Sequence, residues 1–243
     1  MTAIYDRIGV DYAALRRPDR RIAAQINAAL GPARTVLNVG AGAGSYEPVD
    51  RELVALEPSS AMIAQRSVRA APCVGGRAEA LPFRDDAFDA IMAVLTVHHW
   101  DDQVAGLSEL RRVSRGSVVI LTFDPAFRGF WLTDYLPGLI ALDEAQMPPL
   151  DTYESMLGPV EITPVPVPHD CTDGFLCAYW RRPEFYLDPQ VRQGSSSFWA
   201  LGEISKEMER LRRDLADGGW ERRYGALRKL DALDCGYRLV RTV

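Results

Sequence analysis

Residues 35–44 read TVLNVGAGAG, a short apolar run that ends in three alternating glycines. A run of this length with almost no polar residue is typical of a strand buried on both faces of a sheet. Gly40, Gly42 and Gly44 let the backbone turn sharply and approach a ligand with no Cβ in the way. We therefore expect a strand, a tight turn and a binding site at the carboxyl end of that strand.

Short apolar segments alternate with helical patterns around this turn. Such alternation is typical of an α/β protein with a doubly wound parallel sheet. The predicted strands are residues 35–39, 52–56, 73–74, 88–97 and 117–123, and the predicted helices are residues 5–30 (broken near 17–19), 58–69 and 101–113.

The second half of the chain is less regular, and residues 124–157 mix aromatics, prolines and helical fragments. Residues 160–168 alternate like a strand but contain three prolines, which cannot donate to a ladder, so this strand can only lie at a sheet edge. We also predict a charged helix over residues 195–216 and a last strand over residues 236–241.

The composition is that of a globular protein of 243 residues, with 47% hydrophobic and 25% charged residues. No stretch approaches the ~20 apolar residues that a membrane span requires. The first dozen residues lack the features of a signal or transit peptide. We therefore expect a cytoplasmic protein with no membrane partner. The net charge of −5 disfavours a nucleic-acid partner, because phosphate binding requires a basic surface.

The cysteines show no spacing typical of a metal site, and no metal is expected. Buried thiols in a reducing compartment are the main interpretation. Thiol-based metalloid chemistry at Cys171 and Cys177 is the alternative. The four cysteines are Cys73, Cys171, Cys177 and Cys235.

Glu57 stands at the end of the second predicted strand, where a carboxylate can accept the ribose hydroxyls of an adenosine. Ser45 occupies the position at which a dinucleotide fold usually has its third glycine. That substitution disfavours NAD and FAD, which place a pyrophosphate on the helix N-terminus. A nicotinamide dehydrogenase is therefore a disfavoured alternative.

Three segments in this order resemble the motifs of class I S-adenosylmethionine-dependent methyltransferases, in the methyltransferase type 11 branch of ubiquinone and menaquinone biosynthesis. They are residues 36–44, 54–62 and 78–91, and the resemblance extends over about residues 34–124. It implies a Rossmann-like, mostly parallel seven-stranded sheet with an antiparallel last strand and a helical cap over the C-terminal strand edge.

The resemblance also implies one methyltransferase domain over residues 1–243. Its expected parts are a cofactor-binding core at about residues 31–124, capping elements at 1–30 and 125–235, and a last strand at 236–243.

By the same resemblance, the cofactor is S-adenosylmethionine, and the reaction is methyl transfer to O, N or C of a small molecule by in-line displacement. Glu57 would hold the ribose hydroxyls, Ala78 would offer its backbone N–H to adenine, and Glu79 would reach the adenine amine. The predicted cofactor-binding residues are Tyr12, Arg16, Asn38, Gly40, Ala41, Gly42, Glu57, Pro58, Met62, Ala78, Glu79 and Leu95, with Tyr5 as a further candidate.

Two residues depart from the family pattern. Asn38 stands where relatives commonly have an acidic residue that organises the methionine end of the cofactor. Arg77 stands where many relatives have Asp or Ser beside the adenine.

His98 and His99 follow the fourth predicted strand, where open α/β sheets bind ligands, and are the catalytic candidates. One of them could act as a base for the acceptor, or both could simply shape the cofactor pocket. His169 and Asp170 could form a second oriented base, although an Asp-capped turn near Asp173 is the preferred interpretation.

The resemblance leaves other readings open. A member that binds the cofactor without catalysis, or serves another reaction, would carry the same motifs, and so would a methyltransferase acting on RNA or protein. Several aromatics could line an acceptor pocket or form the core of the cap; they are Phe127, Phe130, Trp131, Tyr135, Phe175, Tyr179 and Trp180.

Overall fold

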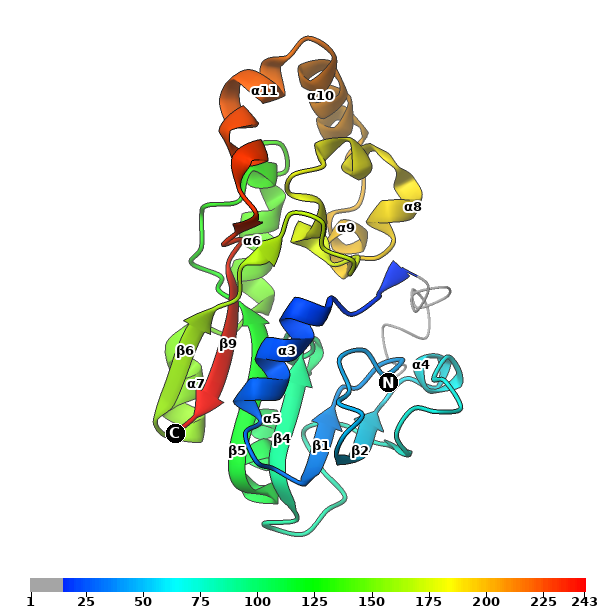
Figure 1. Cartoon of the computed structure of the whole chain (residues 1–243), viewed down its shortest axis with the longest axis vertical. Helices are drawn as coiled ribbons and strands as arrows, with labels where there is room; N and C mark the ends of the chain where they lie inside the picture. Colours follow the sequence, from blue (N-terminus) through cyan, green and yellow to red (C-terminus); the bar gives the residue numbers. More distant parts are fainter. Residues whose placement is uncertain (1–14) are drawn as a thin grey trace.

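A seven-stranded sheet runs through the lower half of the molecule in the computed structural model, which describes residues 15–243 (Figure 1). The strand order is β3-β2-β1-β4-β5-β9-β6, and β9 is antiparallel to both of its neighbours. The α/β, doubly wound fold with one antiparallel strand is thus confirmed. The strands are β1 (Thr35–Val39), β2 (Glu52–Glu57), β3 (Cys73–Gly75), β4 (Phe88–Val94), β5 (Ser114–Phe123), β6 (Val160–Pro164) and β9 (Tyr237–Thr242).

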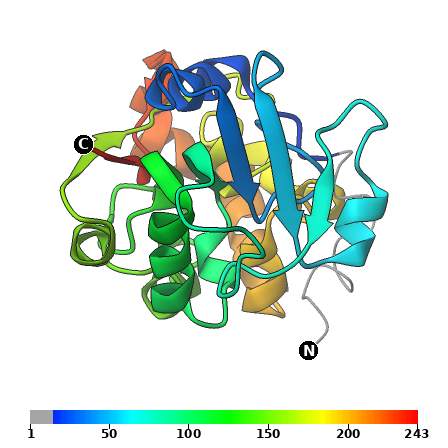
Figure 2. The same ribbon diagram turned by 90° about the horizontal axis from the view of Figure 1, so that it is seen from below.

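Helices cover both faces of this sheet (Figure 2). Helix α3 (Arg20–Ala29) packs on one face, and α5 (Gln103–Val113) and α7 (Leu150–Leu157) pack on the other. Successive strand residues point to opposite faces, so Val36 joins the core beneath α3 while Leu37 joins the core beneath α5. This double coverage explains why β1 and β4 read as almost continuous apolar runs.

Helix α3 shows how local sequence sets an element. Asp19 caps its N-terminus by accepting a hydrogen bond from the backbone N–H of Arg21 at 2.9 Å. Ile22, Ile26 and Leu30 recur at helical spacing, and all three are buried against the sheet.

The proline-rich segment is an edge strand only over its first half, because the strand predicted over residues 160–168 is divided into β6 and a two-residue strand of a separate ladder. Strand β6 lies at the edge of the sheet and pairs only with β9. The predicted last strand is β9, which lies between β5 and β6. A separate two-stranded ladder of β7 (Val167–Pro168) and β8 (Ala232–Leu233) was not predicted, because two residues are too few to give a pattern.

Three predicted boundaries were wrong. The helix predicted over 58–69 is only α4 (Ser60–Ala64), and the fourth strand ends at Val94 rather than at residue 97. The helix predicted over 195–216 is two helices, α9 (Ser196–Leu201) and α10 (Ser205–Ala216). Gly202 separates them with a φ of +70°, a left-handed conformation that ends a helix and that glycine adopts without strain.

A cap stands above the carboxyl ends of the parallel strands (Figure 1). Trp131 donates from its indole to the carbonyl of Trp180 at 2.8 Å, and Trp180 donates to the carbonyl of Val167 at 2.9 Å. None of the seven aromatics named above lines the cavity at the strand ends, and all are buried in the core or packed against it, which favours the core alternative. The remaining helices of the cap are α6 (Gly138–Gln146), α8 (Pro189–Arg192) and α11 (Gly219–Tyr224).

Three of the cysteines are buried, and Cys73 is half-buried. Burial raises the pKa of the Cys171 thiol to about 12 and raises the pKa of Cys177 well above its usual value. Such thiols are unreactive, so the structure gives no support to metalloid chemistry there. Within residues 15–243 no helix is long and apolar enough to cross a membrane, and no cluster of side chains has the make-up of a metal site.

Asp143 of α6 is a buried carboxylate, and burial raises its pKa from 3.8 to about 7, with Arg128 partly opposing the shift. Because the folded state holds the proton more tightly, the ionised form opposes folding increasingly as the pH rises from about 4 to 7. We expect Asp143→Asn to raise the free energy of unfolding by about 1–3 kcal/mol at pH 8 and to change it little at pH 4.

Urea unfolding at both pH values measures this difference. Glu144→Gln, which alters an exposed neighbour on the same helix, is the control and should show no such pH-dependent gain. Equal stability of Asp143→Asn and the wild type at pH 8 would show that the ionised carboxylate is not desolvated.

Candidate functional site

A cavity of about 550 Å³ opens at the carboxyl ends of β1, β2 and β4, where an open α/β sheet binds ligands. Every predicted cofactor-binding residue lines it except Tyr12, which, like Tyr5, lies outside the described residues. His98 and His99 line it as well. The residues predicted from the sequence thus lie around one cavity. Their role as cofactor ligands stays a prediction.

The glycine turn requires glycine at its first position. Gly40 has a φ of +69°, and a Cβ there would overlap the hydroxyl of Thr96. The backbone N–H groups of Gly40 and Ala41 both donate to the carbonyl of Leu56, at 2.9 and 3.1 Å. The turn is thus fixed against β2 on one side and Thr96 on the other.

Glu57 joins the turn to the start of α4. One carboxylate oxygen accepts the N–H of Gly42 at 2.8 Å, and the other accepts the N–H of Ser59 at 2.9 Å. The residue is only 5% exposed, yet it lines the cavity. A carboxylate at this place in the cavity is an acceptor of the type that ribose hydroxyls require.

The charge missing at Asn38 is present on a neighbouring side chain. The Asn38 amide donates to Glu47 at 3.2 Å, and Arg66 forms an ion pair with the same carboxylate at 2.8 Å. Arg66 also donates to the carbonyl of Gly42 at 3.2 Å. Sequence reasoning missed Glu47 and Arg66, because neither stands in a recognised motif.

Arg77 and Glu79 lie together at the adenine end predicted for the cavity. Glu79 accepts the backbone N–H groups of Asp101 and Asp102, at 2.8 and 3.3 Å, just before α5. Arg77 forms an ion pair with Asp101 and a second one with Glu79, the latter at 3.6 Å. Glu79 therefore braces the loop before α5, whatever contact it makes with a ligand.

The two histidines form a short 3-10 helix, Val97–His99, with their ring centroids 3.9 Å apart. Burial lowers the pKa of His98 well below its usual value, helped by His99 and Arg16. Burial and Arg16 lower the pKa of His99 to about 4. Both rings are neutral at pH 7, and a base with so low a pKa abstracts a proton poorly.

The second predicted base does not reach the cavity. Asp170 is exposed and forms an ion pair with Arg21 at 2.7 Å, and His169 does not line the cavity. Tyr46 and Gln146 also line the cavity and were not predicted. They come from the loop after the glycine turn and from the cap, so no single sequence pattern connects them.

Comparison with known proteins agrees with this fold and cavity. The family model described as "Methyltransferase domain" matches residues 37–121. Over 112 residues the chain is 34% identical to demethylmenaquinone methyltransferase of Mycolicibacterium paratuberculosis, a match that covers 44% of this chain and 49% of that protein. The chain thus spans about half the length of the curated relatives it matches.

A solved structure matches over nearly the whole chain. It is a putative methyltransferase from an antibiotic biosynthesis pathway of Anabaena variabilis, 35% identical, with a TM-score of 0.86 and coverage of 94% of this chain and 99% of that one. The [4+2]-cyclase SpnF shares the fold at 13% identity and a TM-score of 0.59, over 98% of this chain and 93% of that one. The chain belongs to the class I S-adenosylmethionine-dependent methyltransferase family.

We expect Gly40→Ala to destabilise the protein more than Gly31→Ala. Both glycines have a positive φ, +69° and +57°, so both substitutions strain the backbone by about 1 kcal/mol. Only the Cβ at position 40 meets another group, the Thr96 side chain, whereas nothing lies within 4 Å of one at position 31. Thermal unfolding of the two variants measures the difference, and equal losses would show that Thr96 yields without cost.

We expect His99 to contribute a fall in the free energy of unfolding as the pH falls from about 6.5 to 4, opposite in sign to the contribution of Asp143. Over that range an unfolded histidine binds a proton, while folded His99 does so only near pH 4, where its pKa lies. His99→Asn should remove up to about 3 kcal/mol of this loss. Urea titrations at both pH values test it, with His169→Asn as the control for an imidazole outside the cavity; an unchanged pH dependence in His99→Asn would contradict burial of a neutral ring.

Proposed function

We propose that this chain transfers a methyl group from S-adenosylmethionine to O, N or C of a small-molecule acceptor. The observation that carries the proposal is one cavity in which a turn with glycine at positions 40 and 42 lies beside the buried carboxylate of Glu57. Its volume of about 550 Å³ is within the range of small-molecule sites.

The proposal assigns the lining residues to the parts of this cofactor as follows. Glu57 would accept the ribose hydroxyls, and the absence of a Cβ at Gly42, which faces Met62, leaves room for the nucleoside. Pro58, Met62 and Ala78 would pack on the adenine. Asn38 and Arg16 would face the methionine end, where Arg16 offers a cation to a carboxylate.

When bound, S-adenosylmethionine supplies a methyl group already activated on a sulfonium. The residues of this chain therefore need chiefly to orient donor and acceptor in line and to exclude water. His98 and His99, partly buried and neutral, can line such a site without repelling a positive sulfonium. The low pKa values of these histidines favour a role in shaping the cavity over a role as a general base. The acceptor would then enter as a nucleophile that needs no deprotonation.

The similarity to demethylmenaquinone methyltransferases supports a small-molecule acceptor. The net charge of −5 disfavours an RNA substrate. Use of the same pocket for a different reaction is the second candidate, since the cyclase SpnF shares this fold. Transfer of a labelled methyl group to metabolite extracts separates the two: S-adenosylhomocysteine binding with no labelled product in any extract would favour the second.

We expect the protein to bind S-adenosylhomocysteine in calorimetry and Glu57→Ala to bind it about 1–3 kcal/mol more weakly, because charge-assisted hydrogen bonds to the ribose are lost. Glu52→Ala is the matched control: Glu52 is an exposed carboxylate at the other end of β2, and its loss should leave the affinity unchanged. Absence of binding by folded wild-type protein would refute the assignment, and unchanged affinity of Glu57→Ala would refute the role of that residue.

A further inference from the structure

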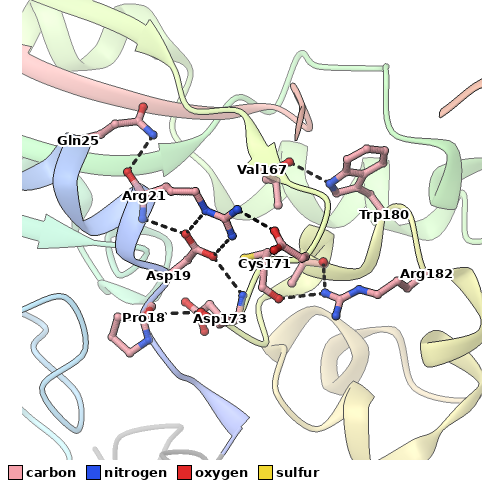
Figure 3. Close-up of polar contacts among 12 residues, drawn as sticks. Pro18, Asp19, Arg21, Gln25, Val167, Cys171, Asp173, Trp180 and Arg182 are labelled. Atoms are coloured by element: carbon pink, nitrogen blue, oxygen red, sulfur yellow. Dashed lines mark hydrogen bonds and ion pairs between the residues drawn. The ribbon is translucent and has the colours of Figure 1, made fainter. Parts of the chain in front are cut away.

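The cap loop at residues 170–174 lies against the segment at residues 15–21, far away in the sequence (Figure 3). The backbone N–H of Thr172 donates to the Asp19 carboxylate at 3.2 Å. Arg21 bridges the two segments on the outside, because it pairs with both Asp19 and Asp170 at 2.7 Å. These contacts fix one segment on the other beside the mouth of the cavity.

Asp173 occupies the inner side of this contact, and its side chain is fully buried. One carboxylate oxygen accepts from Nε of Arg16 at 2.6 Å and from the backbone N–H of Gly174 at 2.7 Å. The other accepts from Nη2 of Arg16 at 3.2 Å and from the hydroxyl of Tyr46 at 2.7 Å. Four donors thus fill the roughly four lone-pair sites of one carboxylate.

Arg16 and Tyr46 both line the cavity, whereas Asp173 does not. Tyr46 is a non-glycine residue with a φ of +64°, a conformation that costs energy and must be held by its surroundings. The charge of Arg16 reaches His98 and His99. Asp173 therefore acts on the cavity through two other side chains, one from the N-terminal segment and one from the loop after the glycine turn.

Gly174 adds a steric restraint to these hydrogen bonds. A Cβ at this position would overlap the backbone carbonyl oxygen of Leu15, the residue before Arg16. The φ of Gly174 is not in the left-handed region, so close packing rather than backbone strain requires glycine here. The cap loop thereby fixes the backbone that leads into Arg16 as well as its guanidinium.

A buried ion pair of this kind contributes little net stability, because desolvation of both charges offsets their attraction. The pair does fix the orientation of the Arg16 side chain, because the planar guanidinium forms two hydrogen bonds with the carboxylate. The orientation of the guanidinium at the methionine end is then set by the cap.

We propose that Asp173 is a positioning residue that fixes Arg16 and Tyr46 at the methionine end of the cavity and thereby sets its preference for a nucleoside that carries an amino-acid carboxylate. The inference rests on the proposed function, because it takes the cavity as the S-adenosylmethionine site. It assigns the discrimination between S-adenosylhomocysteine and 5′-methylthioadenosine, which lacks the amino-acid group, to a residue that touches neither.

Calorimetry with both nucleosides on the full chain tests this. Asp173→Asn keeps the shape of the side chain but removes its negative charge. The amide nitrogen of the asparagine would face N–H or O–H donors and could not accept their hydrogen bonds. The variant should weaken S-adenosylhomocysteine binding about 10- to 100-fold while 5′-methylthioadenosine binding changes by less than about 3-fold. Asp170→Asn, which breaks the exposed ion pair of the same loop with the same segment, should change neither affinity.

Tyr46→Phe removes one of the four donors and should give a smaller loss in the same direction. If Asp173→Asn does not fold, Gly174→Ala carries the test with Gly75→Ala as control, since a Cβ at Gly75 meets nothing within 4 Å. Equal loss of both nucleosides would mean a merely structural role and would overturn the inference. No binding of either nucleoside by the wild type would instead refute the proposed function.

Discussion

A single carboxylate, Glu57, joins the two backbone turns that line the cavity. It accepts one N–H from the glycine turn after β1 and one from the start of α4, so the ends of two neighbouring strands share one acceptor. The group is buried, and the two backbone N–H groups help to stabilise its negative charge. The carboxylate that fixes the site therefore also lines it.

The core could be predicted from sequence because its signals are local. A strand buried on both faces must be apolar, and a sharp turn with a positive φ at residue 40 favours glycine there. Prolines predicted an edge strand, and β6 lies at the edge over residues 160–164. Each of these constraints acts within a few residues, so a single sequence is enough to reveal it.

The rest could not be predicted because it depends on contacts across long sequence separations. Nothing in the segment around Tyr46 indicates that its hydroxyl meets Asp173, and nothing around Asn38 indicates that Glu47 supplies the missing charge. The aromatics of the cap carried no periodicity that separates core from pocket, and Trp131 and Trp180 are core. The pKa of a histidine likewise depends on its burial, which the sequence of residues 97–99 does not contain.

The position of β9 has a consequence for how the chain is made. The ribosome synthesises this strand last, yet it lies inside the sheet, between β5 and β6. Strand β6 has no other partner in the sheet, so it has nothing to pair with while residues 165–236 are still being synthesised. During that time the edge of β5 and the unpaired strand β6 expose backbone N–H and C=O groups that favour aggregation. Completion of the sheet therefore awaits the emergence of residues 237–242 from the ribosome.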